Sequence, residues 1–334
     1  MKRVSMLLSI LIVLVVASDV AARDFPSRDI TNVVPYSAGG GTDSVNRIIS
    51  QAMGPFLGVN INVVNKTGGA TGSVGMNYVW GRPHDGYTLA GQAESNVNAG
   101  ILGGFNKKFD VWHLYLVGGS PDIISVTANS PYKTLRELVE AAKTNPGGIK
   151  ATGSGQGSIH HLNILAFEKG TGAKFHFIPY KGSSEGLNAA MTGEVSVAVN
   201  TLAEQQQLIR SGKLRALGML TPDPFTLENV GVIPSTFSEY PQLSQHLPIS
   251  QILGFAVPAD TPNNAKAVLK EAFDKAMQTD TVKNWAKENY YTLSGKSGEE
   301  AQAIFSRLES LFTWTLWELG DAKVSPESLG IPKP

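Results

Sequence analysis

The sequence contains no cysteine, and this absence excludes disulfide bonds, cysteine nucleophiles and cysteine metal sites. It also lacks an excess of either charge, since 28 basic residues balance 28 acidic ones and no basic tract occurs. A balanced chain argues against nucleic-acid binding and against electrostatic docking on a membrane. Beyond the first residues there is no run of 18 uninterrupted apolar residues, so the composition predicts a soluble mature chain.

The first residues have the three parts of an export signal in order. Lys2 and Arg3 supply positive charge, residues 6–17 form an apolar run, and a small-residue cleavage pattern ends at Ala22. We predict a signal peptide over 1–22, with an N-terminal core helix as the alternative. Removing 22 of 334 residues leaves 312, which is enough for two domains.

Glycine is abundant, with 35 residues, and it occurs in clusters rather than in a linker tract. Each cluster lies at a turn or between a strand-like and a helix-like segment, where glycine lets the backbone approach a bound group closely. The distribution therefore indicates loops that work close to a ligand. The clusters are 39–41, 68–75, 103–104, 118–119, 147–148 and 153–157.

The hydrophobic pattern changes repeatedly between a period of two and a period of 3.6, which indicates alternating strands and helices. This alternation predicts an α/β fold with parallel strand pairing in the first hundred residues and a second run of such units later. The expected strands are 30–34, 59–65, 85–92, 149–155, 175–180, 194–200, 214–220 and 249–262, with a strand-rich stretch at 114–130. The expected helices begin at 44 and 73 and cover 134–148, 158–172, 184–193, 202–212, 263–278 and 297–320.

Local signals predict how two of these helices begin. Thr42 or Asp43 is expected to cap the first helix, and the spacing of Ser297 and Glu300 is that of a capping box. The proline-rich stretch 221–248 is expected to be irregular surface chain.

Two glycine loops, "SAGGGT" (37–42) and "GSGQGS" (153–158), lie between a predicted strand and a predicted helix. A helix N-terminus attracts anions because its first backbone N–H groups have no partner and the helix dipole is positive there. Neither loop has the lysine of a phosphate-binding P-loop, so a carboxylate fits better than a phosphate. A tight turn that binds nothing remains the alternative for each loop.

Other candidate chemistry in the sequence is weak. His160 and His161 are adjacent on a predicted helix, point about 100 degrees apart and cannot readily share a metal ion. Ser154 does not lie in a GxSxG nucleophile motif. Asp43 fits a helix cap better than a general base, and Lys181 is equally suited to pairing with a carboxylate and to bracing a loop. The sequence therefore predicts no catalytic residue, no metal and no cofactor.

Seven motifs, in this order, resemble the Bug-type extracytoplasmic solute receptors, the periplasmic binding proteins of tripartite tricarboxylate transporters. The resemblance covers essentially the whole chain after residue 22, and the joint order of the motifs makes it specific. The motifs are "VVPYSAGGGTDSVNRII" (33–49), "VVNKTGGATGSVG" (63–75), "RPHDGYTLAG" (82–91), "GSGQGS" (153–158), "IPYKGSSEGLNAAMTGEV" (178–195), "SGKLRALGML" (211–220) and "GFAVPADTP" (254–262).

The resemblance implies a type II periplasmic-binding-protein fold, in which two α/β domains are joined by two crossing hinge strands and the ligand lies in the cleft. The implied crossings lie in 116–127 and 250–258. Domain 1 would then cover 23–121 plus 252–334, and domain 2 would cover 122–251.

The resemblance also implies the ligand-binding residues. The first-domain loop would bind a carboxylate through backbone amides, and loops of the second domain would meet the other end of the ligand. The residues implied are Tyr36, Ser37, Ala38, Gly39, Gly40, Gly41, Thr42, Asp43, Gln92, Ser95, Asn96, Gly155, Ser158, Tyr180, Lys181, Gly182, Ser183, Asn200 and Thr201.

Among the departures from the family pattern, two bear on the charge of the ligand. Glu94 lies where a neutral side chain is expected, and it would repel a carboxylate if it faced the cleft. Asn200 lies near a position that is often acidic in the family, which counts against amine-bearing ligands.

The resemblance therefore implies a monomeric periplasmic solute-binding receptor that closes around a small organic carboxylate and delivers it to a tripartite tricarboxylate transporter permease in the membrane. Di- and tricarboxylates are the first expectation, followed by aromatic carboxylates, because Tyr36 and Tyr180 are placed to flank a ring. One alternative is an exported α/β hydrolase, which would need a nucleophile–base pair or a metal set. Another is a receptor that reports to a sensor kinase.

Overall fold

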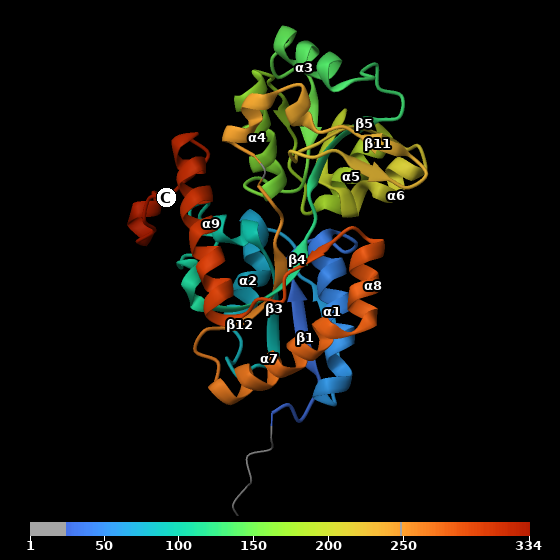
Figure 1. The fold of residues 1–334 in the computed structure, drawn as a ribbon. Helices are drawn as coiled ribbons and strands as arrows, with labels where there is room; N and C mark the ends of the chain where they lie inside the picture. The colour runs from blue at the N-terminus through green and yellow to red at the C-terminus, as the bar shows by residue number, and fades with distance from the viewer. Residues whose placement is uncertain (1–24, 248) are drawn as a thin grey trace, which may run out of the picture.

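The computed structural model describes residues 25–247 and 249–334, so the predicted signal peptide lies outside the described residues. The chain forms two α/β lobes, one above the other in Figure 1. Lobe 1, the lower one, comprises 25–119 and 252–334 and contains a six-stranded sheet. Lobe 2, the upper one, comprises 122–247 and contains a five-stranded sheet. The predicted α/β fold is confirmed, while the domain boundaries at 121/122 and 251/252 stay a prediction.

The sheet of lobe 1 has the order β13-β4-β12-β3-β1-β2. β1 pairs in parallel with β2 and β3, as the alternating pattern predicts, whereas β12 lies antiparallel between β3 and β4. The strands are β1 (Ile30–Val34), β2 (Ile61–Asn65), β3 (Thr88–Ala93), β4 (Trp112–Gly119), β12 (Leu253–Pro258) and β13 (Thr292–Leu293).

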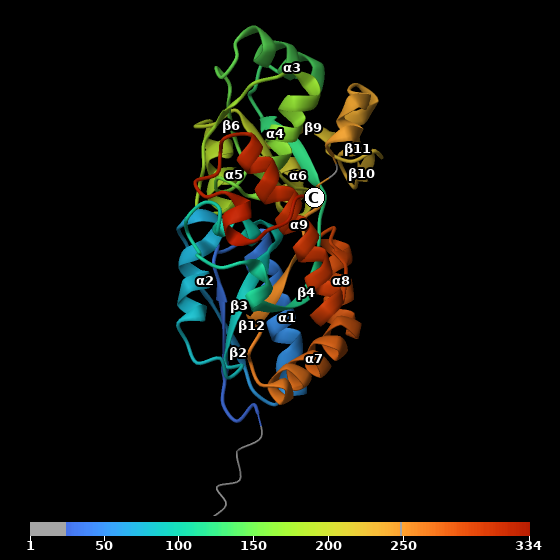
Figure 2. The ribbon, with the colours of Figure 1, turned by 90° about the vertical axis from the view of Figure 1, so that its left-hand side faces the viewer.

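Helices cover both faces of this sheet (Figures 1 and 2). α1 (Gly41–Leu57), α7 (Asn263–Gln278) and α8 (Asp280–Glu288) bury their apolar sides in one core, which includes Val45, Ile49 and Phe273. α2 (Ser73–Trp80) and α9 (Gly298–Glu318) contribute Met76 and Phe305 to the core on the other face. Each such side chain stabilises the fold by about 1.5–3 kcal/mol, so the cores need no disulfide.

The sheet of lobe 2 has the order β7-β6-β8-β5-β9 and is also covered on both faces. Its strands are β5 (Asp122–Thr127), β6 (Lys150–Thr152), β7 (His176–Phe177), β8 (Val197–Thr201) and β9 (Leu214–Met219), with a separate hairpin of β10 (Phe225–Leu227) and β11 (Gly231–Ile233). Its helices are α3 (Leu135–Thr144), α4 (Ile159–Thr171), α5 (Ser183–Thr192) and α6 (Leu202–Arg210). Short 3-10 turns occur at Ala70–Gly72, Glu94–Ala99, Phe109–Val111, Thr236–Ser238, Pro241–Gln245 and Pro326–Leu329.

The chain passes between the lobes at two neighbouring segments. It leaves lobe 1 at the end of β4 and enters lobe 2 at β5, and it returns just before β12 (Figure 1). The two passages touch through their backbones, because a Cβ on Gly119 would overlap the carbonyl oxygen of Gln251. Glycine is therefore required where the connections cross.

α9 reaches beyond its own lobe. Figure 2 shows the helix running from the side of lobe 1 to the level of lobe 2. Leu162 of α4 joins the same apolar cluster as Phe312 and Leu316 of α9. Among residues 25–247 and 249–334, none of the helices is long and apolar enough to span a bilayer.

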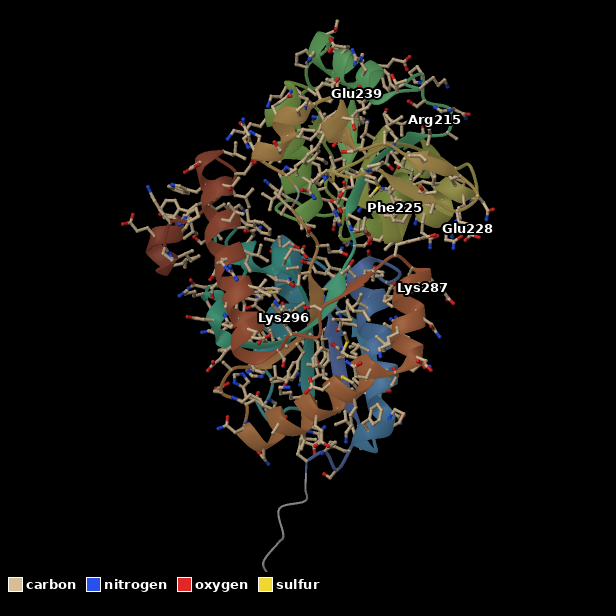
Figure 3. The ribbon with its side chains drawn as sticks, viewed as in Figure 1. Arg215, Phe225, Glu228, Glu239, Lys287 and Lys296 are labelled. Carbon is tan, nitrogen blue, oxygen red and sulfur yellow. The ribbon has the colours of Figure 1, made fainter. Side chains whose placement is uncertain are left out.

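Three local predictions differ from the structure. Gly40, rather than Thr42 or Asp43, is the N-cap of α1, and it makes no side-chain cap bond. Ser297 precedes α9 but likewise makes no side-chain cap bond, so the predicted capping box is wrong. The stretch 221–248 contains the β10–β11 hairpin in addition to irregular chain (Figure 3, near Phe225 and Glu228).

Candidate functional site

Residues at the N-termini of four helices line a cavity between the lobes. α1 contributes from lobe 1, and α4, α5 and α6 contribute from lobe 2, each following a strand or a glycine loop. An inner cavity of about 30 Å³ lies where they meet, and its lining includes Gly41, Ser158, Ser183, Glu204 and Gln251. Since the first N–H groups of a helix have no partner within the helix and its N-terminus carries a partial positive charge, this region attracts negative groups.

A larger outer cavity of about 580 Å³ adjoins the inner one. The two share Tyr36, and the outer lining includes Gly155, Tyr180 and Lys181 from lobe 2. The glycine-rich segment 68–72 of lobe 1 forms part of the same wall. The outer cavity has room for the body of a small organic molecule, whereas the inner one has room for about one water.

The amides of the first loop are already bonded. The Gly39 N–H donates to Oδ2 of Asp43 at 2.9 Å, and the Gly41 N–H donates to Oε1 of Glu204 at 2.6 Å. The backbone amides of this loop were predicted to be free to bind a solute, and for Gly39 and Gly41 that prediction is wrong. A carboxylate does lie at the N-terminus of α1, but it belongs to the protein.

Asp43 braces the loop. Its carboxylate accepts hydrogen bonds from Gly39, from Arg47 at 2.9 Å and from Asn65 at 2.8 Å. Burial raises the pKa of Asp43, but these hydrogen bonds and the Arg47 charge lower it by more. The pKa of Asp43 is therefore below its usual value. Asp43 thus ties the start of α1 to β2.

Tyr36 connects the loop to the other side of lobe 1. Its hydroxyl donates to the carbonyl of Thr71 at 3.2 Å, lies 3.2 Å from the Ser95 hydroxyl and accepts from Asn96 at 3.0 Å. Gln92, on the neighbouring strand, is fully buried, and neither polar atom of its amide has a partner among the described residues. Tyr36 and Ser95 border the inner cavity, whereas Asn96 lies outside its lining and bonds to Tyr36.

The two lobes touch each other around the cavities. The Ser184 hydroxyl donates to the carbonyl of Ala38 at 2.9 Å and lies 2.8 Å from the Ser37 hydroxyl. Asn98 of lobe 1 donates to the carbonyl of Gly157 in lobe 2 at 2.8 Å. These contacts describe a closed arrangement of the lobes.

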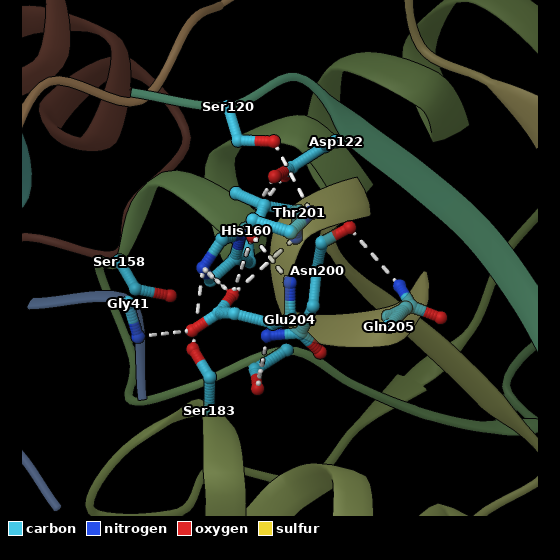
Figure 4. A network of polar contacts seen from close by, with 12 residues as sticks. Gly41, Ser120, Asp122, Ser158, His160, Ser183, Asn200, Thr201, Glu204 and Gln205 are labelled. Atoms are coloured by element: carbon cyan, nitrogen blue, oxygen red, sulfur yellow. Dashed lines mark hydrogen bonds and ion pairs between the residues drawn. The ribbon is translucent and has the colours of Figure 1, made fainter. Parts of the chain in front are cut away.

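His160 is the centre of a buried charged network (Figure 4). Its Nδ1 lies 2.8 Å from Oδ2 of Asp122, and its Nε2 lies 3.8 Å from Oε2 of Glu204 and 3.4 Å from Oγ of Ser183. Burial lowers the pKa of His160, but the charge and hydrogen bond of Asp122 and the charges of Glu204 and Glu94 outweigh it and raise the pKa to about 9. The imidazole is therefore positively charged at neutral pH.

Glu94 faces this site, as the sequence analysis warned. Its carboxylate borders the inner cavity and accepts a hydrogen bond from the Ile252 N–H at 2.7 Å. Burial raises its pKa to about 7, although that backbone bond and the charge of His160 oppose the rise. Near neutral pH a large fraction of Glu94 is uncharged, so its repulsion of an anion is reduced.

Some of the predicted site residues line a cavity, and others lie outside both cavity linings. Ser158 is the N-cap of α4, and Asn200 donates to the carbonyl of Gly153 at 3.0 Å. Seven predicted residues line the inner cavity, namely Tyr36, Gly40, Gly41, Thr42, Ser95, Ser158 and Ser183. Gly155, Tyr180 and Lys181 line the outer one, together with Tyr36. The cavity linings do not include Ser37, Ala38, Gly39, Asp43, Gln92, Asn96, Gly182, Asn200 or Thr201.

Asp122, Glu204 and Gln251 were not among the site residues predicted from the sequence. A signal for Glu204 exists, because Thr201 and Glu204 have capping-box spacing at the start of a helix that follows a strand. No local signal indicates that its other oxygen reaches lobe 1.

Sequence comparison identifies related proteins along most of the chain. The sequence model described as "Tripartite tricarboxylate transporter family receptor" matches residues 45–307. A protein of Pseudomonas sp. strain P51, from a tcbD-tcbE intergenic region, is 27% identical over 84% of this chain and 83% of its own. Protein BugT of Bordetella pertussis is 30% identical over 63% of this chain and 66% of its own.

Solved structures share the fold. An R. palustris protein solved with adipate has a TM-score of 0.81 at 22% identity, covering 90% of this chain and 99% of its own. MatC from Rhodopseudomonas palustris, solved with bound malate, has a TM-score of 0.74 at 21% identity, covering 89% of this chain and 99% of its own.

Proposed function

Because this chain belongs to the family of tripartite tricarboxylate transporter receptors, we propose that it captures a small organic carboxylate in the cleft between its lobes. The observation that carries the proposal is the carboxylate of Glu204, which already accepts the Gly41 N–H and lies beside the cationic His160. A group of this charge and shape is therefore accommodated at the N-terminus of α1. The adipate and malate bound by two proteins of the same fold are dicarboxylates, which supports this ligand class.

In the mechanism that we propose, the solute first meets lobe 1 and is then enclosed by lobe 2. One carboxylate would bind the backbone of the loop 36–42, and the rest of the solute would extend into the outer cavity toward Gly155 and Tyr180. Closure brings the N-termini of α4 and α5 onto the solute, while the two connecting segments absorb the rotation. The solute favours the closed form only through its greater affinity for that form.

We further propose that the chain is exported by residues 1–22 and works in the periplasm, where a membrane permease receives the closed, loaded receptor. Family membership and the order of charged, apolar and small residues in this segment support export. The division into domain 1 (23–121 plus 252–334) and domain 2 (122–251) belongs to the same proposal.

A thermal-shift screen tests the ligand class. Adipate or L-malate at a hundred times its dissociation constant is expected to add about 2.7 kcal/mol to the free energy of unfolding. Gly41→Val should abolish the shift, because even a Cβ at this position would lie 3.2 Å from Gln251, Glu204 and Tyr291.

The control is Gly81→Ala, whose Cβ would make only ordinary contacts of 3.4 Å or more at the end of α2, away from the cleft. Its shift should equal that of the wild type. If organic acids leave the wild type unshifted, or if Gly41→Val responds like the wild type, the proposed site is wrong.

The alternative of a hydrolase has one observation in its favour. Ser183, His160 and Asp122 lie in the order of a nucleophile, a base and an orienting acid, with separations of 3.4 Å and 2.8 Å. A base must accept a proton, however, and a His160 with a pKa of about 9 already holds one at neutral pH. We therefore propose that the chain is not an enzyme.

Accordingly, 4-nitrophenyl acetate at pH 7 should be hydrolysed no faster by the wild type than by Ser183→Ala. The release of 4-nitrophenol measures this directly. A wild-type rate that the serine substitution removes would favour the hydrolase instead.

A further inference from the structure

Glu204 does more than its position in the helix requires. It is the third residue of α6, where its Oε2 accepts the Thr201 N–H at 3.4 Å, which completes a capping box, and the Thr201 hydroxyl at 2.9 Å. Its Oε1 crosses to the other lobe and accepts the Gly41 N–H at 2.6 Å (Figure 4). The carboxylate is therefore shared between its own helix and the N-terminus of α1.

A second capping box, at the start of α3, shows the bonds that a glutamate makes when it only caps a helix. Glu137 of α3 forms a capping box with Thr134, and within the part of the chain that the structure describes its carboxylate bonds only to the amides of Lys133 and Thr134. Glu137 is exposed, whereas the Glu204 side chain is only 4% exposed. Bonding across the cleft is thus specific to Glu204 and does not follow from the motif.

Glu204 leaves little space beside it. The inner cavity measures about 30 Å³, against about 580 Å³ for the outer cavity. Gln251 also points toward Gly41, and its Oε1 is buried without a partner among the described residues. The site is therefore built for polar recognition, and Glu204 occupies it.

Charge also prevents a solute carboxylate from binding beside Glu204. Among the described residues that line the inner cavity, His160 is the only basic side chain, and Asp122 already pairs with it. Two carboxylates at one helix N-terminus would repel each other in a region with little water. A solute carboxylate and Glu204 must therefore exclude each other.

We propose that Glu204 is a tethered competitor of the solute, occupying the anion position at the N-terminus of α1 until a solute carboxylate displaces it. This inference rests on the proposed function. While Glu204 is bound, it links the lobes and favours closure of the empty receptor. When the solute displaces it, the Glu204 carboxylate bonds only within α6, and the solute links the two lobes instead. Because the solute must first displace Glu204, its apparent affinity is lowered.

Removal of the competitor gives a direct test. Glu204→Ala should bind adipate or L-malate about ten-fold more tightly than the wild type by calorimetry, because a charged hydrogen bond no longer has to be broken. Glu204→Gln should fall between the two. Glu137→Ala is the matched control, since it removes the same capping interaction from α3, and its affinity should equal that of the wild type.

A second measurement needs no solute. Because the sequence has no cysteine, Gln51→Cys on α1 and Lys143→Cys on α3 provide single spin-label sites on the two lobes. Without solute, Glu204→Ala should lengthen the distance between the labels, and Glu137→Ala should leave it unchanged.

The outcomes separate this inference from the proposed function. If the wild type binds an acid and Glu204→Ala binds it equally or more weakly, Glu204 is not a competitor and the inference is overturned. If neither acid binds any of the proteins, the proposed ligand class is wrong. The distance between the spin labels then tests by itself whether Glu204 links the lobes. A longer distance in Glu204→Ala then supports the tether, and an unchanged distance overturns it.

Discussion

Gly182→Val is expected to weaken solute binding about 5- to 160-fold while the protein remains folded. Gly182 precedes α5 and packs against lobe 1, where a Cβ would lie 2.9 Å from the backbone nitrogen of Ser37 and closer still to its hydroxyl. Its backbone is extended, with φ at 178°, so any residue can adopt it. The substitution therefore strains the closed form alone.

The size of the effect follows from overpacking. Added methyl groups at a tight contact cost about 1–3 kcal/mol, which corresponds to about 5- to 160-fold in affinity when only the closed form is affected. Calorimetric titration with adipate or L-malate measures the loss, and the unfolding temperature without solute shows whether the fold persists. Gly81→Ala again serves as the control, because its added Cβ meets only ordinary contacts. Wild-type affinity in Gly182→Val would mean that the solute does not require this closure.

Asp122→Ala is expected to lower the free energy of unfolding by about 3–5 kcal/mol, since it removes one partner of a buried ion pair. Asp122 accepts from His160 at 2.8 Å and from Asn163 at 2.7 Å, and both members of the ion pair are almost fully buried. Urea denaturation at pH 6.5 measures the change. Asp110→Ala is the matched control, because Asp110 pairs with Lys108 at the surface and such pairs contribute about 0–1 kcal/mol.

The same pair makes stability depend on pH in a definite direction. Folded His160 keeps its proton up to a pKa of about 9, whereas the unfolded chain loses it near the ordinary value of 6.5. The folded state therefore holds more protons between these values, and stability falls as pH rises through this window, by on the order of 3 kcal/mol. In Asp122→Ala this fall should largely disappear. Equal slopes in the two proteins would show that His160 is not held in the charged form.

Other buried titratable groups also make stability depend on pH, and they determine the pH range in which the effect of His160 can be measured. The pKa values of Glu94 and Glu309 are raised by burial to about 7, so these groups also reduce stability as pH rises, mainly below pH 7. The pKa of His161 is lowered by burial to about 4, which has the opposite effect between pH 4 and 6.5. The interval from pH 7 to 9 therefore reports chiefly on His160.

Local sequence predicted most of the elements, because strand and helix periodicity is visible within a few residues. The loop 37–42 does connect a strand to α1, and 153–158 does lead from β6 into α4. The same local rules failed at helix starts such as Ser297, where the capping residue has the right identity but makes no cap bond. Identity at a cap position does not determine which way the side chain turns.

The sequence by itself determined that this protein has an α/β fold and that glycine-rich helix N-termini would provide an anion site, since both depend on residues close together in the chain. Only the tertiary structure decided which carboxylate occupies that site. The bond from Gly41 to Glu204 joins residues 163 positions apart, and the pairing of His160 with Asp122 joins residues 38 apart. The first contact depends on how the two lobes meet, and the second depends on how α4 packs against β5. Both also depend on the direction of individual side chains, which has no local signature in the sequence.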